Sequence, residues 1–73
     1  MSTHQIESEV TGSVWKILKN VGDTVNDGDV IMILESMKME IPIISEEEGT
    51  ITEICVAEGA SIGEGHVVAI LAL

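Results

Sequence analysis

Short apolar runs alternate with turn residues along the whole chain. The runs are rich in Val and Ile, and clusters of Gly, Asp, Asn and Glu separate them. Such runs favour β-strands, because branched side chains fit a pleated, half-buried surface. No stretch keeps an uninterrupted apolar period of 3.6 residues for long enough to predict a helix. The expected strands are residues 4–11, 13–18, 24–25, 30–35, 39–44, 50–56, 60–62 and 66–73.

Four positions carry further expectations about these strands. Residues 30–35 are apolar at both alternating positions, which predicts a strand buried on both sides or at the core of a sandwich. Pro42 interrupts the run 39–44, which predicts an edge or interrupted strand because proline cannot donate to a ladder. Gly12 and Gly49 are expected in the turns that precede the strands 13–18 and 50–56. Cys55 is expected to be a small core residue within a strand.

The chain repeats itself when it is shifted by 37 positions, and the alignment needs no gap. The identical pairs are Ile6 and Ile43, Ser8 and Ser45, Glu9 and Glu46, Gly12 and Gly49, Ile17 and Ile54, Gly22 and Gly59, Gly28 and Gly65, Val30 and Val67, Ile33 and Ile70, and Leu34 and Leu71. Residues 1–73 therefore read as one domain made of two half-repeats, about 1–37 and 38–73. Eight short strands in two equivalent halves predict an all-β fold. We expect a flattened barrel or sandwich of two four-stranded antiparallel sheets with a pseudo-two-fold axis.

The repeat also predicts where the junction between the halves lies. The halves meet at Met37 and Lys38, between two strand-like runs, so these residues are expected at a hairpin tip. Under a two-fold axis, the place equivalent to this tip is the gap between the two chain ends. Lys38 is therefore expected at the end of the domain opposite to the termini.

Charge and composition restrict the partners and the compartment. Thirteen acidic residues against three lysines give a formal net charge of −10, which weighs against nucleic acid or an anionic membrane as a partner. The single cysteine cannot form an internal disulfide. No signal peptide is expected at the N-terminus, and no apolar run is long enough to span a membrane. These features predict a cytoplasmic protein that is a monomer when isolated.

Catalytic and metal-binding motifs are missing from the sequence. His4 and His66 lie far apart and have no metal-ligand spacing, and there is no phosphate loop or nucleophile–base pair. An independent enzyme is therefore not expected. The one unusual stretch is the junction itself, where a lone lysine stands between two methionines and is flanked by acids.

This stretch, Glu35-Ser36-Met37-Lys38-Met39, resembles the Glu-Ala-Met-Lys-Met motif of biotinyl domains. The resemblance extends over almost the whole chain, which is also similar in length and arrangement to the small stand-alone biotin/lipoyl attachment proteins of bacilli. The other matching segments are Gly12-Ser13-Val14-Trp15, Val21-Gly22-Asp23, Gly28-Asp29, Gly49 and Glu58-Gly59. This chain departs from the motif in having Ser36 where Ala is commoner.

The resemblance implies a cofactor carrier that does no bond chemistry of its own. A biotin protein ligase would attach biotin covalently to Lys38, with Glu35, Ser36, Met37 and Met39 contributing to recognition by the ligase. The carrier would then shuttle carboxybiotin between the active sites of a biotin carboxylase and a carboxyltransferase. Methionine side chains are flexible and polarizable, which suits contact with a ligase groove or the biotin ring.

Two alternatives to the biotin carrier remain open from the sequence. Lipoyl domains often have Glu and Ser or Thr upstream of the lysine, so Glu35-Ser36 also fits a lipoyl carrier of 2-oxo acid dehydrogenase-type complexes, modified by a lipoyl ligase. Met37 and Met39 favour biotin, because lipoyl domains typically have Asp before the lysine and Ala after it. The second alternative is an unmodified protein-interaction module, which would not need Lys38 to be acylated.

Overall fold

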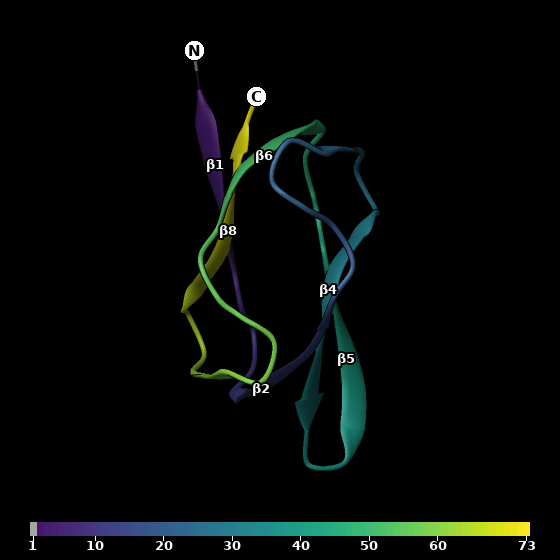
Figure 1. The fold of residues 1–73 in the computed structure, drawn as a ribbon, viewed down its shortest axis with the longest axis vertical. Coiled ribbons are helices and arrows are strands. Elements are labelled where there is room, and N and C mark those ends of the chain that lie inside the picture. Colours follow the sequence, from purple (N-terminus) through teal and green to yellow (C-terminus); the bar gives the residue numbers. More distant parts are fainter. Residues whose placement is uncertain (1) are drawn as a thin grey trace.

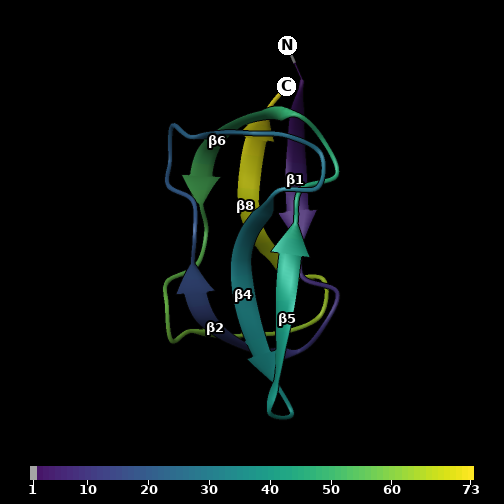
Figure 2. The ribbon, with the colours of Figure 1, turned by 90° about the vertical axis from the view of Figure 1, so that its right-hand side faces the viewer.

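The fold is all-β and consists of two antiparallel sheets of four strands each (Figures 1 and 2). The structure is a computed structural model and describes residues 2–73. The strands are β1 (Thr3–Glu7), β2 (Gly12–Ile17), β3 (Thr24–Val25), β4 (Val30–Ser36), β5 (Met39–Ile44), β6 (Gly49–Ile54), β7 (Ser61–Ile62) and β8 (Val67–Ala72). This confirms the predicted fold class. No helix within residues 2–73 is long and apolar enough to span a membrane.

The two sheets exchange strands between the halves of the chain. One sheet has the order β1-β8-β6-β3 and the other has the order β5-β4-β2-β7. Each sheet therefore takes two strands from each half. The two orders are equivalent, because β1, β3, β6 and β8 of one sheet correspond to β5, β7, β2 and β4 of the other. Because the halves are interleaved, neither can bury its apolar residues without the other.

A β-bulge shapes the long central strand of each sheet. In β4, Val30 pairs with Ile44 and Met32 pairs with Ile43, so that Ile31 is an extra residue. Bulges place an additional residue on one strand and change its twist. Ile31 and Met32 are consequently both buried, although they are consecutive. This bulge explains why residues 30–34 are apolar at both alternating positions. Of the two environments predicted for this strand, burial on both sides or the core of a sandwich, the structure shows the second.

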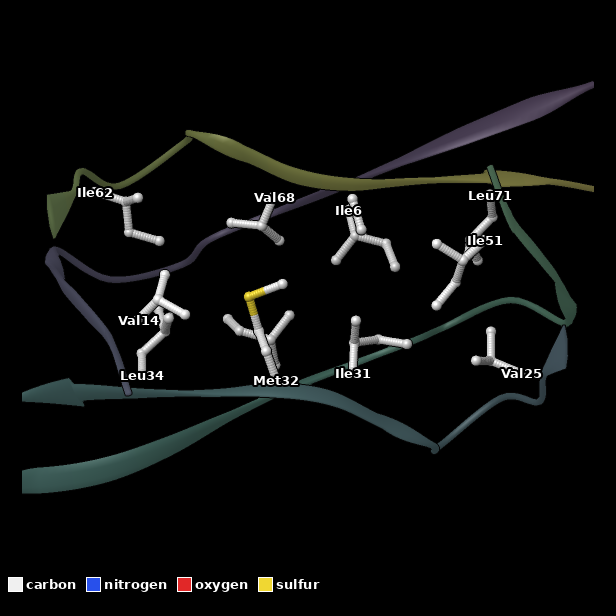
Figure 3. Packing of buried hydrophobic residues seen from close by; sticks show 12 residues of the cluster. Ile6, Val14, Val25, Ile31, Met32, Leu34, Ile51, Ile62, Val68 and Leu71 are labelled. Atoms are coloured by element: carbon white, nitrogen blue, oxygen red, sulfur yellow. The ribbon is translucent and has the colours of Figure 1, made fainter. Parts of the chain in front are cut away.

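The core fills the space between the two sheets, and the tip of the β4–β5 hairpin extends beyond it (Figure 3). It is aliphatic apart from Met32, whose sulfur lies near the middle of the labelled residues in Figure 3. Dense packing of this kind leaves little freedom for the strands that carry the core residues. The buried apolar residues are Ile6, Val14, Val25, Ile31, Met32, Leu34, Ile43, Ile51, Ile62, Val68, Ala69 and Leu71.

Two of the sequence predictions about glycine are wrong. Gly12 and Gly49 are the first residues of β2 and β6 and do not lie in turns. A Cβ atom on Gly12 would lie 2.5 Å from the carbonyl oxygen of Glu35, and one on Gly49 would lie 2.6 Å from that of Ala72. Both positions therefore need glycine because a neighbouring strand passes too close for a side chain.

The prediction that Cys55 is a core residue is also wrong. Cys55 follows the end of β6 and is exposed. A strict period of two from the buried Ile51 would point Cys55 inward. Thr52 is an extra residue in a bulge, since Ile51 pairs with Leu71 while Glu53 pairs with Ile70. The bulge shifts the alternation of inward and outward side chains by one residue, so that Cys55 points outward. The prediction for Pro42 is confirmed, because β5 is an edge strand.

The molecule is elongated, and its two ends differ in what they present. Its extents are 37 × 17 × 17 Å, with both termini at one end of the long axis and the β4–β5 hairpin at the other (Figure 1). The end pair of β4 and β5 joins Ser36 and Met39. At the opposite end, the equivalent contact is a hydrogen bond from the Leu73 amide to the Ser2 carbonyl, at 2.9 Å. The hairpin tip is thus as far from the chain ends as the fold allows.

Candidate functional site

The β4–β5 hairpin ends in a two-residue turn with an uncommon backbone conformation. Met37 and Lys38 have φ angles of 52° and 64°. Positive φ at both central residues is the conformation of a type I′ turn, whose twist matches that of the two strands. Left-handed backbone costs about 1–2 kcal/mol for a residue with a side chain. The six residue pairs between β4 and β5 hold the turn in this conformation.

The base of the hairpin is fixed by contacts with the segment that leads into β2. The Ser36 hydroxyl donates a hydrogen bond to the Thr11 carbonyl oxygen at 2.8 Å. Gly12 lies directly against the Glu35 backbone, so the entry to β2 packs closely against the end of β4. These contacts position the tip relative to the body of the domain.

The tip presents one amine and two thioethers to solvent. Lys38 is exposed, Met37 is 93% exposed and Met39 is 61% exposed. Exposed methionines at the end of a hairpin contribute nothing to the core, which favours a role in contacts with another molecule. Because the lysine carries a flexible four-carbon stem, its amine can reach several ångströms away from the turn.

Two acids flank the lysine on the strands. Glu35 and Glu40 are direct cross-strand partners and both are exposed. Like charges that lie opposite each other are mildly destabilising, and Lys38 carries the one positive charge of the hairpin sequence. Acylation of Lys38 would remove that charge and leave the tip more acidic.

All five predicted site residues lie at this one end of the molecule: Glu35, Ser36, Met37, Lys38 and Met39. The sequence prediction missed the contribution of Thr11 and Gly12. For Gly12 the signal was present in the repeat, since Gly49 occupies the equivalent position at the other end. No such signal marks Thr11, which contributes only its carbonyl oxygen.

The other candidate residues do not form a site. Among residues 2–73, no three His, Cys, Asp or Glu side chains are arranged to hold a metal ion. His4 lies in β1 opposite Leu71, and His66 lies in the turn before β8. Two hollows beside β1 and β5 are lined by residues of these strands and of the neighbouring loops, and Lys38 borders neither.

The exposed thiol of Cys55 is weakly acidic. Desolvation is the largest cause that raises the pKa of the Cys55 thiol. The hydrogen bond that the thiol donates to Glu53 and the negative charge of Glu53 raise this pKa further. The Sγ atom lies 3.6 Å from Glu53 Oε2. A raised pKa disfavours the nucleophilic thiolate.

A rigid all-β domain with one lysine on an exposed, conformationally fixed turn has the form of a carrier for a covalently attached group. The chain matches the family model described as "Biotin-requiring enzyme" over residues 2–71. It therefore belongs to the biotin/lipoyl attachment domain family.

Individual relatives agree with this assignment. The chain is 39% identical to the biotin/lipoyl attachment protein of Bacillus subtilis (strain 168) over 62 residues, which cover 85% of each chain. It is 35% identical to the biotinylated protein TB7.3 homolog of Mycobacterium leprae (strain TN) over 66 residues, covering 90% of this chain and 93% of the relative.

A solved structure confirms the fold. The urea carboxylase of Kluyveromyces lactis contains a matching region with a TM-score of 0.93 and 32% sequence identity. The match covers 99% of this chain but 6% of that much longer one. Domains similar to this chain therefore occur both as small proteins and as parts of large carboxylases.

Proposed function

We propose that Lys38 is the attachment site of biotin and that the protein is a biotin carboxyl carrier. The observation that carries the proposal is the placement of Lys38 at an exposed type I′ turn with methionine on either side. The names of two relatives support biotin as the cargo, since one is described as biotinylated and the matching structure is a carboxylase.

Attachment requires an accessible amine in a fixed position. In its neutral form, the Lys38 Nζ attacks the acyl carbon of biotinyl-adenylate bound to a biotin protein ligase. An amide bond forms, the bond between the acyl carbon and the phosphate oxygen breaks, AMP leaves, and the amine loses one proton. The turn assists because Met37 and Lys38 are held in one conformation before the ligase binds, so little ordering remains to be done.

Carriage depends on the distance between the hairpin and the chain ends. Bound biotin would accept a carboxyl group at a biotin carboxylase and give it up at a carboxyltransferase. The domain holds this arm on a rigid tip, which replaces a bimolecular encounter by a high local concentration when the carrier is docked. The termini lie at the far end, so any segment attached there would not obstruct the tip. In this role the chain is a carrier and not a catalyst.

The test is in vitro acylation by a purified biotin protein ligase with biotin and ATP. We expect wild-type protein to gain the mass of one biotinyl group and Lys38→Arg to gain none. Lys16 and Lys19 remain in the variant as internal controls for specificity. A variant that is still biotinylated, or a wild type that gains no mass, would contradict the proposal.

A lipoyl carrier is the second candidate, because the Bacillus subtilis relative is described as an attachment protein for either group. Met37→Asp distinguishes the two. Asp adopts left-handed backbone more readily than most residues, and the Met37 side chain is 93% exposed, so the variant is expected to fold normally. If Met37 selects for biotin, the variant loses biotinylation and gains lipoylation by a lipoyl ligase. Unchanged biotinylation would exclude Met37 as the discriminating residue.

A further inference from the structure

The outer face of the sheet β5-β4-β2-β7, which we call the hairpin sheet, carries a patch that is apolar except for one lysine. We call it the hairpin face and define it as Trp15, Lys16, Ile33, Pro42 and Ile44. Lys16 on β2 pairs with Ile33 on β4, which pairs with Pro42 on β5. The bulge at Trp15 turns it outward beside Lys16, and Ile44 continues the face along β5. Trp15 is 50% exposed and Ile44 is 46% exposed.

The other sheet provides an internal control for this face. Its equivalent row runs from Thr52 and Glu53 on β6 through Ile70 on β8 to Gln5 on β1, with Glu7 at the place of Ile44. The backbone is the same, including the bulge, yet four of the five positions hold polar or acidic residues. The fold therefore does not require an apolar or basic residue at these four places on the hairpin sheet. Exposed apolar surface that the fold does not need is typical of an interaction site.

The position of the amine restricts which partner can cover this face. An enzyme that acts on Lys38 Nζ must approach to within one side-chain length of the turn. The β4–β5 hairpin is a direct continuation of the sheet that carries the hairpin face (Figure 2). The inner side of that sheet packs on the core (Figure 3), so the body of such an enzyme can lie against its outer side.

We propose that the hairpin face is the docking surface for the enzyme that acylates Lys38. This inference depends on the proposed function. Trp15 is the central anchor, because a large aromatic side chain can fill a hollow and supply much of the binding energy. Lys16 is one of three lysines in a chain of net charge −10, so the complementary surface carries an apolar hollow with a carboxylate beside it.

The variants for the test are taken from the equivalent positions of the other sheet. Trp15→Thr and Lys16→Glu introduce the residues found at 52 and 53, which the same backbone already accommodates. Biotinylation by a purified biotin protein ligase is measured at varied carrier concentration. We expect Trp15→Thr to raise KM by about 10-fold or more, as for an interface anchor, with kcat changed less than about twofold. Lys16→Glu is expected to raise KM several-fold, and by less at high salt.

Matched controls lie on the other sheet. The double variant Gln5→Glu/Thr52→Glu changes the net charge by the same two units as Lys16→Glu, on the face that we do not assign to docking. Its KM is expected to equal that of the wild type. Unchanged KM in both hairpin-face variants, equal changes in the control, or a loss confined to kcat would overturn the docking surface. If the ligase does not biotinylate the wild-type protein, the proposed function itself is wrong. This outcome is distinguishable from failure of the docking surface, because it is measured on the wild type alone.

Discussion

Replacement of Gly12 by Ala tests how the body of the domain positions the hairpin. The added Cβ would lie 2.5 Å from the Glu35 carbonyl oxygen and 3.2 Å from Ser36 Cβ, so β2 and β4 must move apart. Overpacking of this kind costs about 1–3 kcal/mol, and the lower entropy of the unfolded chain returns about 0.4–1 kcal/mol. The mid-values of these ranges leave a net loss of about 1.3 kcal/mol, which for a domain of this size lowers Tm by roughly 5–10 °C.

The same displacement should disturb acylation, because it acts at the base of the turn. A shift of about 1 Å in a reacting group can lower a rate by roughly 100-fold, so we expect kcat/KM for biotinylation to fall by about 10-fold or more. Thermal unfolding followed by circular dichroism and steady-state biotinylation well below Tm measure the two effects.

Gly49→Ala is the matched control for this prediction. Its Cβ would lie 2.6 Å from the Ala72 carbonyl oxygen, at the end of the molecule that holds the termini. The two variants should lose similar stability, while Gly49→Ala keeps the wild-type rate of biotinylation. A wild-type Tm for Gly12→Ala would refute the contact argument. Equal losses of acylation in both variants would refute the claim that the entry to β2 positions the tip.

Three further predictions follow from individual contacts. Ser36→Ala removes the hydroxyl that donates to the β1–β2 loop, worth about 1 kcal/mol, and should lower Tm by roughly 4–8 °C while biotinylation persists; a wild-type Tm would contradict this. Gly22→Val and Gly59→Val place a branched residue at φ angles of 96° and 89°, where the space around each added Cβ is open. Because the backbone strain is the same at both positions, both variants should lower Tm to similar extents, and a large difference would count against the two-fold equivalence. Glu53→Gln removes the negative charge that helps to raise the pKa of Cys55 and replaces the carboxylate acceptor by a weaker, neutral amide oxygen. The pH profile of iodoacetamide alkylation should therefore move to lower pH, and an unmoved profile would refute the assignment.

The repeat made most of the fold predictable. Turn residues at equivalent spacings located all eight strands to within a few residues, and Pro42 identified an edge strand. The errors arose where a contact between strands decides the outcome. Gly12 needs glycine because of the Glu35 backbone, and the exposure of Cys55 depends on the bulge at Thr52. Neither cause is visible in the local pattern of apolar and polar residues.

The candidate site was predictable in position but not in conformation. The junction of the half-repeats placed Lys38 on a turn far from the termini, which the structure bears out. The positive φ angles at Met37 and Lys38 were not predictable, because neither residue is one of the usual glycine or asparagine residues of a type I′ turn. The pairing of β4 with β5 imposes this conformation, because Met37 and Lys38 have no preference of their own for it.

The most direct test of the central claim is the intact mass of the protein purified from its own host, followed by peptide mapping. We expect the mass of one biotinyl group on the chain, located on the peptide that contains Lys38. An unmodified chain, a lipoyl group in place of biotin, or a biotinyl group on Lys16 or Lys19 would contradict it.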